Sequence, residues 1–213
     1  MCIRFLTRMR FEHPFRLIVA GPSNCGKSTW VFRLLEHLDQ MCPEIERVVY
    51  CYNSFQEAFD RIKGVEFHEG LDILDELKLE KRACLLICDD FMNHPKLNEI
   101  CEFFTRHSHH SGTSVVFITQ NFFNKSKSTR DLSLSASHVS FFKSPRDMGQ
   151  IYALARQMYP RNSNFMIESY QDATTSPHGY LFLDLSQQAN ENRRLTTKIF
   201  PGEKTVAYVK IQE

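Results

Sequence analysis

Short apolar runs alternate with amphipathic stretches along most of the chain. Five runs have the length and the content of Val, Ile, Leu and Phe that are typical of buried strands: RLIVA (16–20), RVVYCY (47–52), ACLLICDD (83–90), TSVVFITQ (113–120) and HVSFFK (138–143). Helical periodicity marks stretches between most of them: TWVFRLLEHLDQM (29–41), EAFDRI (57–62), LDILDELKL (71–79), LNEICEFFTRH (97–107) and MGQIYALARQMY (148–159). Strands that alternate with helices and are apolar almost throughout predict a mostly parallel sheet with helices on both faces.

The rest of the chain extends this pattern. HGYLFLDLSQ (178–187) is interpreted as a further strand, and TKIF (197–200) with TVAYVKI (205–211) as a terminal hairpin or edge pairing. The most polar connector is SKSTRDLSLSAS (126–137), which we expect to be a loop. With 213 residues, 42% of them hydrophobic and 24% charged, the chain suits one α/β domain with a small appendage.

The first strand-like run leads directly into GPSNCGKSTW (21–30), which fits the spacing G-x-x-x-x-G-K-[ST] of a Walker A phosphate loop. In such a loop, backbone N–H groups and the start of a helix surround a phosphate. Lys27 would reach the β- and γ-phosphates, and Ser28 would bind Mg²⁺. The alternative is a chance match in a Gly/Ser turn. The predicted ATP phosphate-binding residues are Gly21, Pro22, Ser23, Asn24, Cys25, Gly26, Lys27, Ser28 and Thr29.

Two adjacent acids, Asp89 and Asp90, follow the apolar run ACLLIC. A phosphate loop needs one carboxylate for Mg²⁺ and a second that orients or deprotonates the attacking water. We assign Asp89 to Mg²⁺ and Asp90 to the water, as in a Walker B motif. The alternative is that the pair caps the next helix, because Asp is a good N-cap residue.

A polar residue also ends the run TSVVFITQN. Gln120 at this strand end could bind the γ-phosphate or the attacking water and so sense the nucleotide, or it could be an ordinary polar residue at a strand end. Two strand-like runs, RVVYCY and VEFH (65–68), separate the phosphate loop from the acids in sequence. This spacing is typical of ATPases whose sheet inserts a strand between those two motifs, and it argues mildly against nucleotide kinases.

The charged residues are distributed unevenly along the chain. The net charge is only +1, but residues 21–119 hold ten basic and sixteen acidic side chains, and both ends of the chain are basic. Phosphate contacts with DNA require only a few basic residues, so Lys125, Lys127 and Lys143 are candidates for DNA binding, with a solvated surface as the alternative. No run approaches the roughly 18 apolar residues of a membrane span, and the N-terminus lacks the core of a signal peptide, so we expect an intracellular protein.

The seven cysteines are odd in number and lack a repeating spacing, which indicates reduced thiols. Cys25 lies within the phosphate loop, close to Lys27 and to a helix N-terminus. Such surroundings lower a thiol pKa, so its thiol could be unusually reactive. The alternative is a small residue that merely fits the loop.

Together, GPSNCGKST, LLICDD, GTSVVFITQN, RDLSLSASHVSFFKSPRD and LARQMYP resemble the FtsK/HerA superfamily of DNA-pumping ATPases over residues 16–184. The likeness is strongest to the viral genome-packaging branch, which includes poxvirus-type ATPases and relatives in Polinton/Maverick elements and adintoviruses. It implies a P-loop NTPase fold of the ASCE type, with a basic segment 1–15, an ATPase core 16–186 and a small C-terminal β extension 187–213.

The resemblance also implies function. Lys27 and Ser28 would bind ATP and Mg²⁺, Asp89 and Asp90 would be the Walker B acids, and Gln120 the sensor. Such enzymes form homo-oligomeric rings, pentamers or hexamers, around double-stranded DNA, and a neighbouring subunit inserts an arginine finger, for which Arg106 and Arg130 are the candidates. A capsid or portal protein would be a partner, in the nucleus or at a cytoplasmic viral assembly site of the host cell, with transient association with the virion. The chain departs from many relatives in having Asp90 where they have Glu.

We therefore expect an ATP-driven DNA translocase that packages a viral or virus-like genome. A small P-loop nucleotide or nucleoside kinase is the main alternative, with SKSTRD (126–131) as its lid. A nucleotide-gated binding protein without turnover is a third hypothesis, based on Asp90 in place of Glu.

Overall fold

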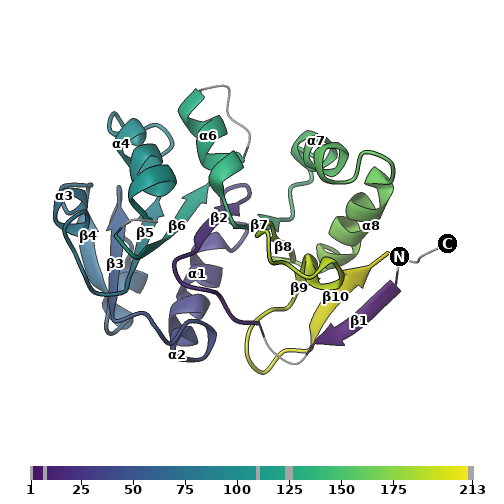
Figure 1. The fold of residues 1–213 in the computed structure, drawn as a ribbon, viewed down its shortest axis with the longest axis horizontal. Helices are drawn as coiled ribbons and strands as arrows, with labels where there is room; N and C mark the ends of the chain where they lie inside the picture. Colours follow the sequence, from purple (N-terminus) through teal and green to yellow (C-terminus); the bar gives the residue numbers. More distant parts are fainter. Residues whose placement is uncertain (1, 7–8, 109–110, 123–126, 211–213) are drawn as a thin grey trace.

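The computed structural model describes residues 2–6, 9–108, 111–122 and 127–210. Within these residues, ten strands form one sheet (Figure 1). The strands are β1 (Cys2–Leu6), β2 (Arg16–Ala20), β3 (Arg47–Tyr52), β4 (Glu66–Glu69), β5 (Cys84–Asp89), β6 (Thr113–Thr119), β7 (His138–Phe142), β8 (Tyr180–Asp184), β9 (Leu195–Thr197) and β10 (Thr205–Val209).

Most helical elements lie between the strands of the parallel part or before β8, and one 3₁₀ turn lies between β8 and β9. They are α1 (Lys27–Glu36), α2 (Leu38–Met41), the 3₁₀ turn η1 (Glu57–Arg61), α3 (Leu74–Leu77), α4 (Leu97–Glu102), the π-helical turn η2 (Phe103–His107), α6 (Lys127–Ser135), α7 (Gly149–Met158), α8 (Ser163–Ala173) and the 3₁₀ turn η3 (Glu191–Arg193). No helix of the described residues has both the length and the apolar composition that crossing a membrane requires.

The sheet has the strand order β1-β10-β9-β8-β7-β2-β6-β5-β3-β4. The strands from β7 to β4 pair in parallel, and those from β8 to β1 continue the same sheet in antiparallel pairing. β6 lies between β2 and β5, so a strand is inserted between the strand before the phosphate loop and the strand that ends in the acids. This confirms the order that the sequence spacing indicated.

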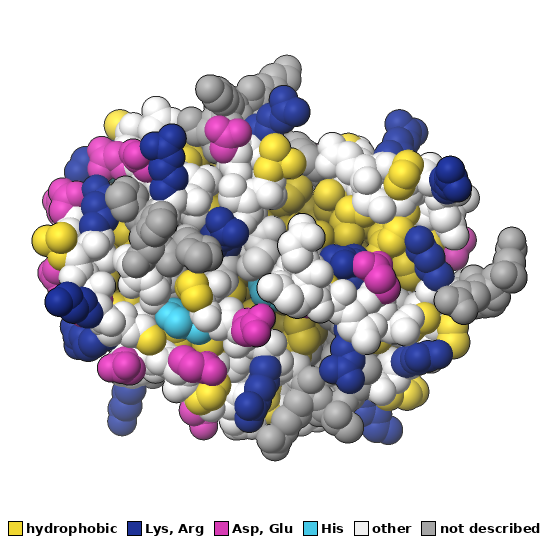
Figure 2. All heavy atoms as spheres, in the orientation of Figure 1, with side chains coloured by type: hydrophobic (Ala, Val, Ile, Leu, Met, Phe, Trp, Pro, Cys, Tyr) yellow, Lys and Arg dark blue, Asp and Glu magenta, His cyan; other side chains and the backbone are white. Residues whose placement is uncertain are grey.

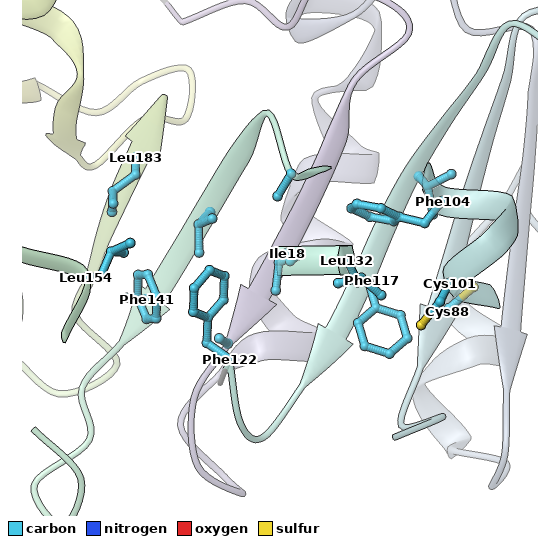
Figure 3. Packing of buried hydrophobic residues seen from close by; sticks show 14 of the residues in the cluster. Ile18, Cys88, Cys101, Phe104, Phe117, Phe122, Leu132, Phe141, Leu154 and Leu183 are labelled. Atoms are coloured by element: carbon cyan, nitrogen blue, oxygen red, sulfur yellow. The ribbon is translucent and has the colours of Figure 1, made fainter. Parts of the chain in front are cut away.

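Alternating residues of the central strands face two separate cores. Along β2, Ile18 and Ala20 belong to one buried cluster, while Leu17 and Val19 belong to the other. The first cluster is covered by residues of α3, α4, α6, α7 and α8, and Figure 3 shows part of it. The second is covered by α1, α2 and η1. Helices on both faces explain why these strands are apolar at nearly every position.

The α1 helix fastens the parallel part of the sheet to the antiparallel part. The ring of Trp30 is 4% exposed and lies 5.1–6.4 Å from the rings of Tyr180, Phe182 and Phe200. Edge-to-face and offset contacts of this kind add to the free energy that burial alone provides. The helix that starts at the phosphate loop is therefore held by residues about 150 to 170 positions further along the chain.

Charge is distributed unevenly over the surface. On the face shown in Figure 2, acidic side chains are interspersed with Lys and Arg over the end formed by β4, α3 and α4, and the opposite end shows mainly Lys and Arg.

Several elements differ from the expected ones. The polar connector 126–137 contains the helix α6, because Leu132 (3% exposed) packs into the cluster between sheet and helices (Figure 3) and tertiary contacts override the weak helix propensity of its serines. The expected helix 29–41 is interrupted at His37, and the helical stretches 57–62 and 71–79 contain only η1 and the four-residue α3. The helix α8 had no predicted counterpart.

The division into three segments stays a prediction. In the sheet, the N-terminal strand β1 pairs with β10, with Ile3 opposite Tyr208. Residues of the first and last predicted segments therefore lie side by side at one edge (Figure 1).

Candidate nucleotide-binding site

The phosphate loop connects β2 to α1 by a tight path that only certain residues permit. Asn24 has φ of 61° and Gly26 has φ of 103°, both in the left-handed region that Gly and Asn tolerate best. A Cβ on Gly21 would lie 2.6 Å from Phe142 Cβ and 2.8 Å from Cys25 Sγ, so this position also requires glycine. Successive backbone N–H groups in such a turn form a concave anion-binding nest at the start of the helix.

The side chain of Lys27 folds back over the loop. Its Nζ donates hydrogen bonds of 2.8 Å to Gly21 O and 2.9 Å to Pro22 O. Both acceptors are neutral carbonyls, and a phosphate oxygen would be a stronger acceptor for the same ammonium group because both partners would then be charged.

A pocket of about 140 Å³ adjoins the loop. It unites five of the residues predicted from sequence with others that sequence reasoning did not single out for this site: Lys27, Ser28, Asp89, Asp90 and Gln120, together with Gln56, Ile118 and Thr119. The elements that supply them are α1, the connection after β3, and the carboxyl ends of β5 and β6. The carboxyl ends of parallel strands are the place where α/β sheets bind ligands.

Asp89 is a buried carboxyl group held by a tyrosine. It is 7% exposed, and Tyr50 donates a 2.7 Å hydrogen bond from its hydroxyl to Asp89 Oδ2. Burial raises the pKa of Asp89 above its ordinary value, an effect that the Tyr50 hydrogen bond and the positive charge of Lys27 partly offset. Because burial disfavours the ionised form of Asp89, a cation bound beside the carboxylate would be favourable.

Asp90 differs from its neighbour in both backbone and exposure. Its φ is 61°, and it is exposed at the pocket wall, whereas Asp89 is still part of the strand. Asp and Asn are among the few non-glycine residues that adopt this conformation at modest cost. The change of backbone direction separates two adjacent carboxylates into a buried and an exposed one.

The end of β6 is joined directly to the phosphate loop. Gly21 N donates a 3.2 Å hydrogen bond to Thr119 O, and the Thr119 hydroxyl bridges the backbone of Asn121 by donating to its O (3.0 Å) and accepting from its N (3.2 Å). This turn leaves Gln120 exposed and in the wall of the pocket. The predicted sensor residue therefore adjoins both the loop and the two acids.

Gln150 of α7 forms hydrogen bonds with the segment that follows Gln120. Its Oε1 accepts a 2.7 Å hydrogen bond from Phe122 N, and its Nε2 donates to Asn121 Oδ1 (3.2 Å) and to Asp147. The amide of one glutamine thus connects the turn after β6 with the start of α7. Sequence reasoning missed Gln150, because a glutamine on an amphipathic helix carries no local signal of this contact.

Neither of the two candidate finger arginines lines the pocket, and neither does Lys143. Arg106 on η2 has a side chain that is 75% exposed and forms an ion pair of 3.4 Å with Glu102, and Arg130 on α6 is exposed. Lys143 follows β7, is exposed and donates to Thr175 O (3.3 Å). Lys125 and the side chain of Lys127 are outside the described residues.

The hypothesis that Cys25 is unusually reactive is not supported. Its side chain is buried (9% exposed), and burial raises the pKa of the thiol although Lys27 acts in the opposite direction. The buried thiol packs against the other apolar residues of the second core, which supports the alternative of a small residue that fits the loop.

The residues of the pocket fit a magnesium–nucleotide complex. Ser28 supplies a hydroxyl and Asp89 a carboxylate, two hard oxygen ligands that line one pocket, and Mg²⁺ is commonly bound by one or two protein oxygens together with phosphates and water. The unfavourable burial of the Asp89 carboxylate is the observation that favours a cation here.

No protein-family model and no curated protein matches the chain. Solved structures with a similar fold include the genome packaging NTPase B204 from Sulfolobus turreted icosahedral virus 2. Its complex with sulfate is 12% identical over 84% of this chain and 95% of that chain, with a TM-score of 0.59. Its complex with ATP-gammaS is 14% identical over 84% and 96%, with a TM-score of 0.54.

The complex of the same protein with AMPPCP is similar to an equal degree, at 14% identity over 83% of this chain and 95% of that chain, with a TM-score of 0.55. At such identities the likeness is one of fold. Together with the large, mostly parallel sheet, it shows that the chain has the mixed α/β fold of P-loop NTPases and confirms the predicted fold class.

Proposed function

We propose that the protein is an ATPase that moves double-stranded DNA, and that it packages a viral or virus-like genome into a capsid. The observation that carries the proposal is the pocket in which Lys27, Ser28, Asp89, Asp90 and Gln120 meet, with the strand of Gln120 inserted between the phosphate-loop strand and the acid-bearing strand. The similarity in fold to a genome packaging NTPase that has been solved with ATP-gammaS supports it.

Each residue of the pocket has a place in the proposed hydrolysis. Lys27 would exchange its two carbonyl acceptors for the β- and γ-phosphates, and the N–H groups of the loop would bind the phosphate oxygens. Ser28 and Asp89 would hold Mg²⁺, which neutralises charge on the phosphates when it is bound. Asp90 would orient the attacking water and accept its proton, and Gln120 would contact the γ-phosphate.

Assembly into a ring would bring a second positive charge to the described pocket. Among the described residues, the pocket wall contains one basic side chain, Lys27. An arginine from a neighbouring subunit would supply the second positive charge, and in related NTPases such a residue is worth ~10³ to 10⁵ in rate. Arg106 and Arg130 are exposed and are the residues we propose for this role.

Double-stranded DNA would be held through its phosphates. Lys125, Lys127 and Lys143 are the proposed contacts, because phosphate binding needs positive charge without base recognition. By the sequence resemblance, the protein would belong to the FtsK/HerA packaging branch of poxvirus-type or Polinton-like ATPases. It would act with a capsid or portal protein at the site of viral assembly in the host cell.

The alternative of a small nucleoside kinase has less support. Of the segment 126–131, which would have to form its lid, residues 127–131 belong to α6, and α6 packs against the sheet through Leu132. The inserted strand β6 is also the arrangement that the sequence spacing associated with ATPases.

Displacement of a third strand from linear duplex DNA tests translocation directly. A triplex-forming oligonucleotide bound at one end of the duplex is expected to be released by the wild type in an ATP-dependent manner, and to remain bound with Lys27→Ala. ATP hydrolysis that is active yet never releases the third strand would contradict translocation. Transfer of phosphate from ATP to a nucleoside in preference to water would establish the kinase instead.

A further inference from the structure

A histidine from the far end of the chain contacts the phosphate loop. His178 lies in the turn between α8 and β8, and its Nδ1 is 3.0 Å from Cys25 O. A carbonyl oxygen only accepts hydrogen bonds, so Nδ1 must carry the hydrogen in this contact. Sequence reasoning treated this stretch, HGYLFLDLSQ, only as a strand.

The turn holds His178 in a demanding conformation. Its φ is 58°, in the left-handed region, although it is not a glycine. The next residue must be glycine, because a Cβ on Gly179 would lie 2.6 Å from Ala173 O. Both backbone polar groups of Gly179 form hydrogen bonds: its N donates to Ser176 O at 3.1 Å, and its O accepts from Lys143 N at 3.1 Å. A strained residue that is held so firmly is a reason to look for a function.

The loop is shaped to receive the imidazole. A Cβ on Gly26 would lie 3.2 Å from His178 Nδ1, closer than an ordinary contact, so the absence of a side chain at Gly26 allows the ring to approach. With Lys27 bonded to Gly21 O and Pro22 O, two side chains thus bind three carbonyl oxygens of the loop.

Peptide geometry gives this contact a consequence for phosphate binding. In a trans peptide bond, the carbonyl of Cys25 and the N–H of Gly26 are held in one plane and point in opposite directions. A hydrogen bond that fixes the direction of the Cys25 carbonyl therefore also fixes the direction of the Gly26 N–H. In a phosphate loop, such N–H groups are the donors that bind phosphate oxygens.

We infer that His178 is a positioning residue of the phosphate loop, which orients the Gly26 N–H for a nucleotide phosphate by donating a hydrogen bond to Cys25 O. The inference rests on the proposed nucleotide binding and adds a residue of the turn before the antiparallel strand β8 to that site. His178 acts through the loop backbone, so we expect its loss to change the affinity for nucleotide.

Two substitutions separate the hydrogen bond from the backbone strain. His178→Gly removes the donor and relieves the positive φ, whereas His178→Asn keeps a donor and a residue that tolerates this φ. Lys198→Gly is the matched control, because Lys198 is also an exposed non-glycine residue with positive φ (55°), located between β9 and β10. The affinity for a fluorescent ATP analogue and the melting temperature are measured for each full-length variant, with Lys27→Ala as the reference for loss of the site.

We expect His178→Gly to weaken binding of the analogue about three- to tenfold, as for one lost hydrogen bond, without lowering the melting temperature. His178→Asn should restore affinity to within about twofold of wild type, and Lys198→Gly should leave it unchanged. Wild-type affinity in His178→Gly, alongside Lys27-dependent binding in the wild type, would overturn the role of His178 alone. Equal binding by the wild type and Lys27→Ala would overturn the proposed nucleotide site and this inference with it.

Discussion

Tyr50 on β3 donates its hydroxyl hydrogen to Asp89 at the end of the neighbouring strand β5, at 2.7 Å. In the strand register Tyr50 lies opposite Ile87, so the tyrosine reaches diagonally to the acid two residues further along. Burial and the adjacent carboxylate raise the pKa of the Tyr50 hydroxyl, so it remains a donor. The contact stabilises the ionised form of a carboxyl group that burial disfavours.

Replacement of Tyr50 by Phe should make ATP hydrolysis more sensitive to acid. Loss of the hydrogen bond raises the pKa of Asp89 further, so the ionised form is lost at higher pH as the solution is acidified. A hydrogen bond to a charged group is worth about 1.5–3 kcal/mol, so we expect roughly a tenfold loss of activity on the acid side of the pH profile and a smaller loss at alkaline pH. Tyr52→Phe, on the same strand, should leave the profile unchanged. A uniform loss at all pH values for Tyr50→Phe would contradict this role.

Asp89→Asn should stabilise the protein while removing the magnesium ligand. The raised pKa of Asp89 means that the folded state binds the proton more tightly than the unfolded state does. Stability is therefore lost as pH rises from 3.8, the ordinary pKa, through the raised pKa. At neutral pH we expect the free energy of unfolding of Asp89→Asn to exceed that of the wild type by on the order of 1 kcal/mol.

Chemical denaturation near pH 4 and pH 8 measures this difference, which should be larger at pH 8. Asp90→Asn is the matched control, because Asp90 is exposed and Asn tolerates its positive φ, so its stability should stay close to that of the wild type. A destabilised Asp89→Asn at pH 8 would show that the carboxylate is stabilising despite its burial.

Gln150→Ala should separate nucleotide binding from hydrolysis. The substitution releases Asn121 and Phe122 from α7 and so loosens the turn that presents Gln120, but it leaves the phosphate loop intact. We expect kcat to fall about tenfold or more, with little change in the affinity for ATP. Gln157→Ala, an exposed glutamine on the same helix, is the control. An equal loss of affinity and kcat would contradict this prediction and would show that Gln150 supports the pocket as a whole.

Much of this site follows from local sequence, and some of it could not. The phosphate loop, the two acids and Gln120 each sit beside a strand whose apolar run is visible in the sequence, and the spacing of the runs indicated the inserted strand. By contrast, the pairing of β1 with β10, the hydrogen bond from Phe122 N to Gln150 and the contact of His178 with Cys25 join residues far apart in the chain. Periodicity carries no information about such contacts. The helix α6 was missed for a related reason, since burial of Leu132 against the sheet decides its structure.

Mixing of inactive subunits tests whether an arginine acts between neighbours. Arg106→Ala and Lys27→Ala should each lose activity, the arginine variant by ~10³-fold or more if it removes the finger. Mixed together, they should regain activity, because the intact site of one subunit would meet the intact arginine of the next. The same mixture with Arg130→Ala distinguishes the two candidates, and Arg156→Ala on α7 serves as an exposed control. Absence of recovery with either arginine would contradict the proposed finger.

The most direct measurement is ATP hydrolysis by the wild type and Lys27→Ala over a range of protein concentrations, with and without linear double-stranded DNA. The account predicts activity that depends on Lys27, rises steeply with protein concentration and is stimulated by DNA. Activity that depends on Lys27 but is indifferent to concentration and DNA would contradict a ring-shaped DNA translocase, and activity that survives Lys27→Ala would contradict the assignment of the site itself.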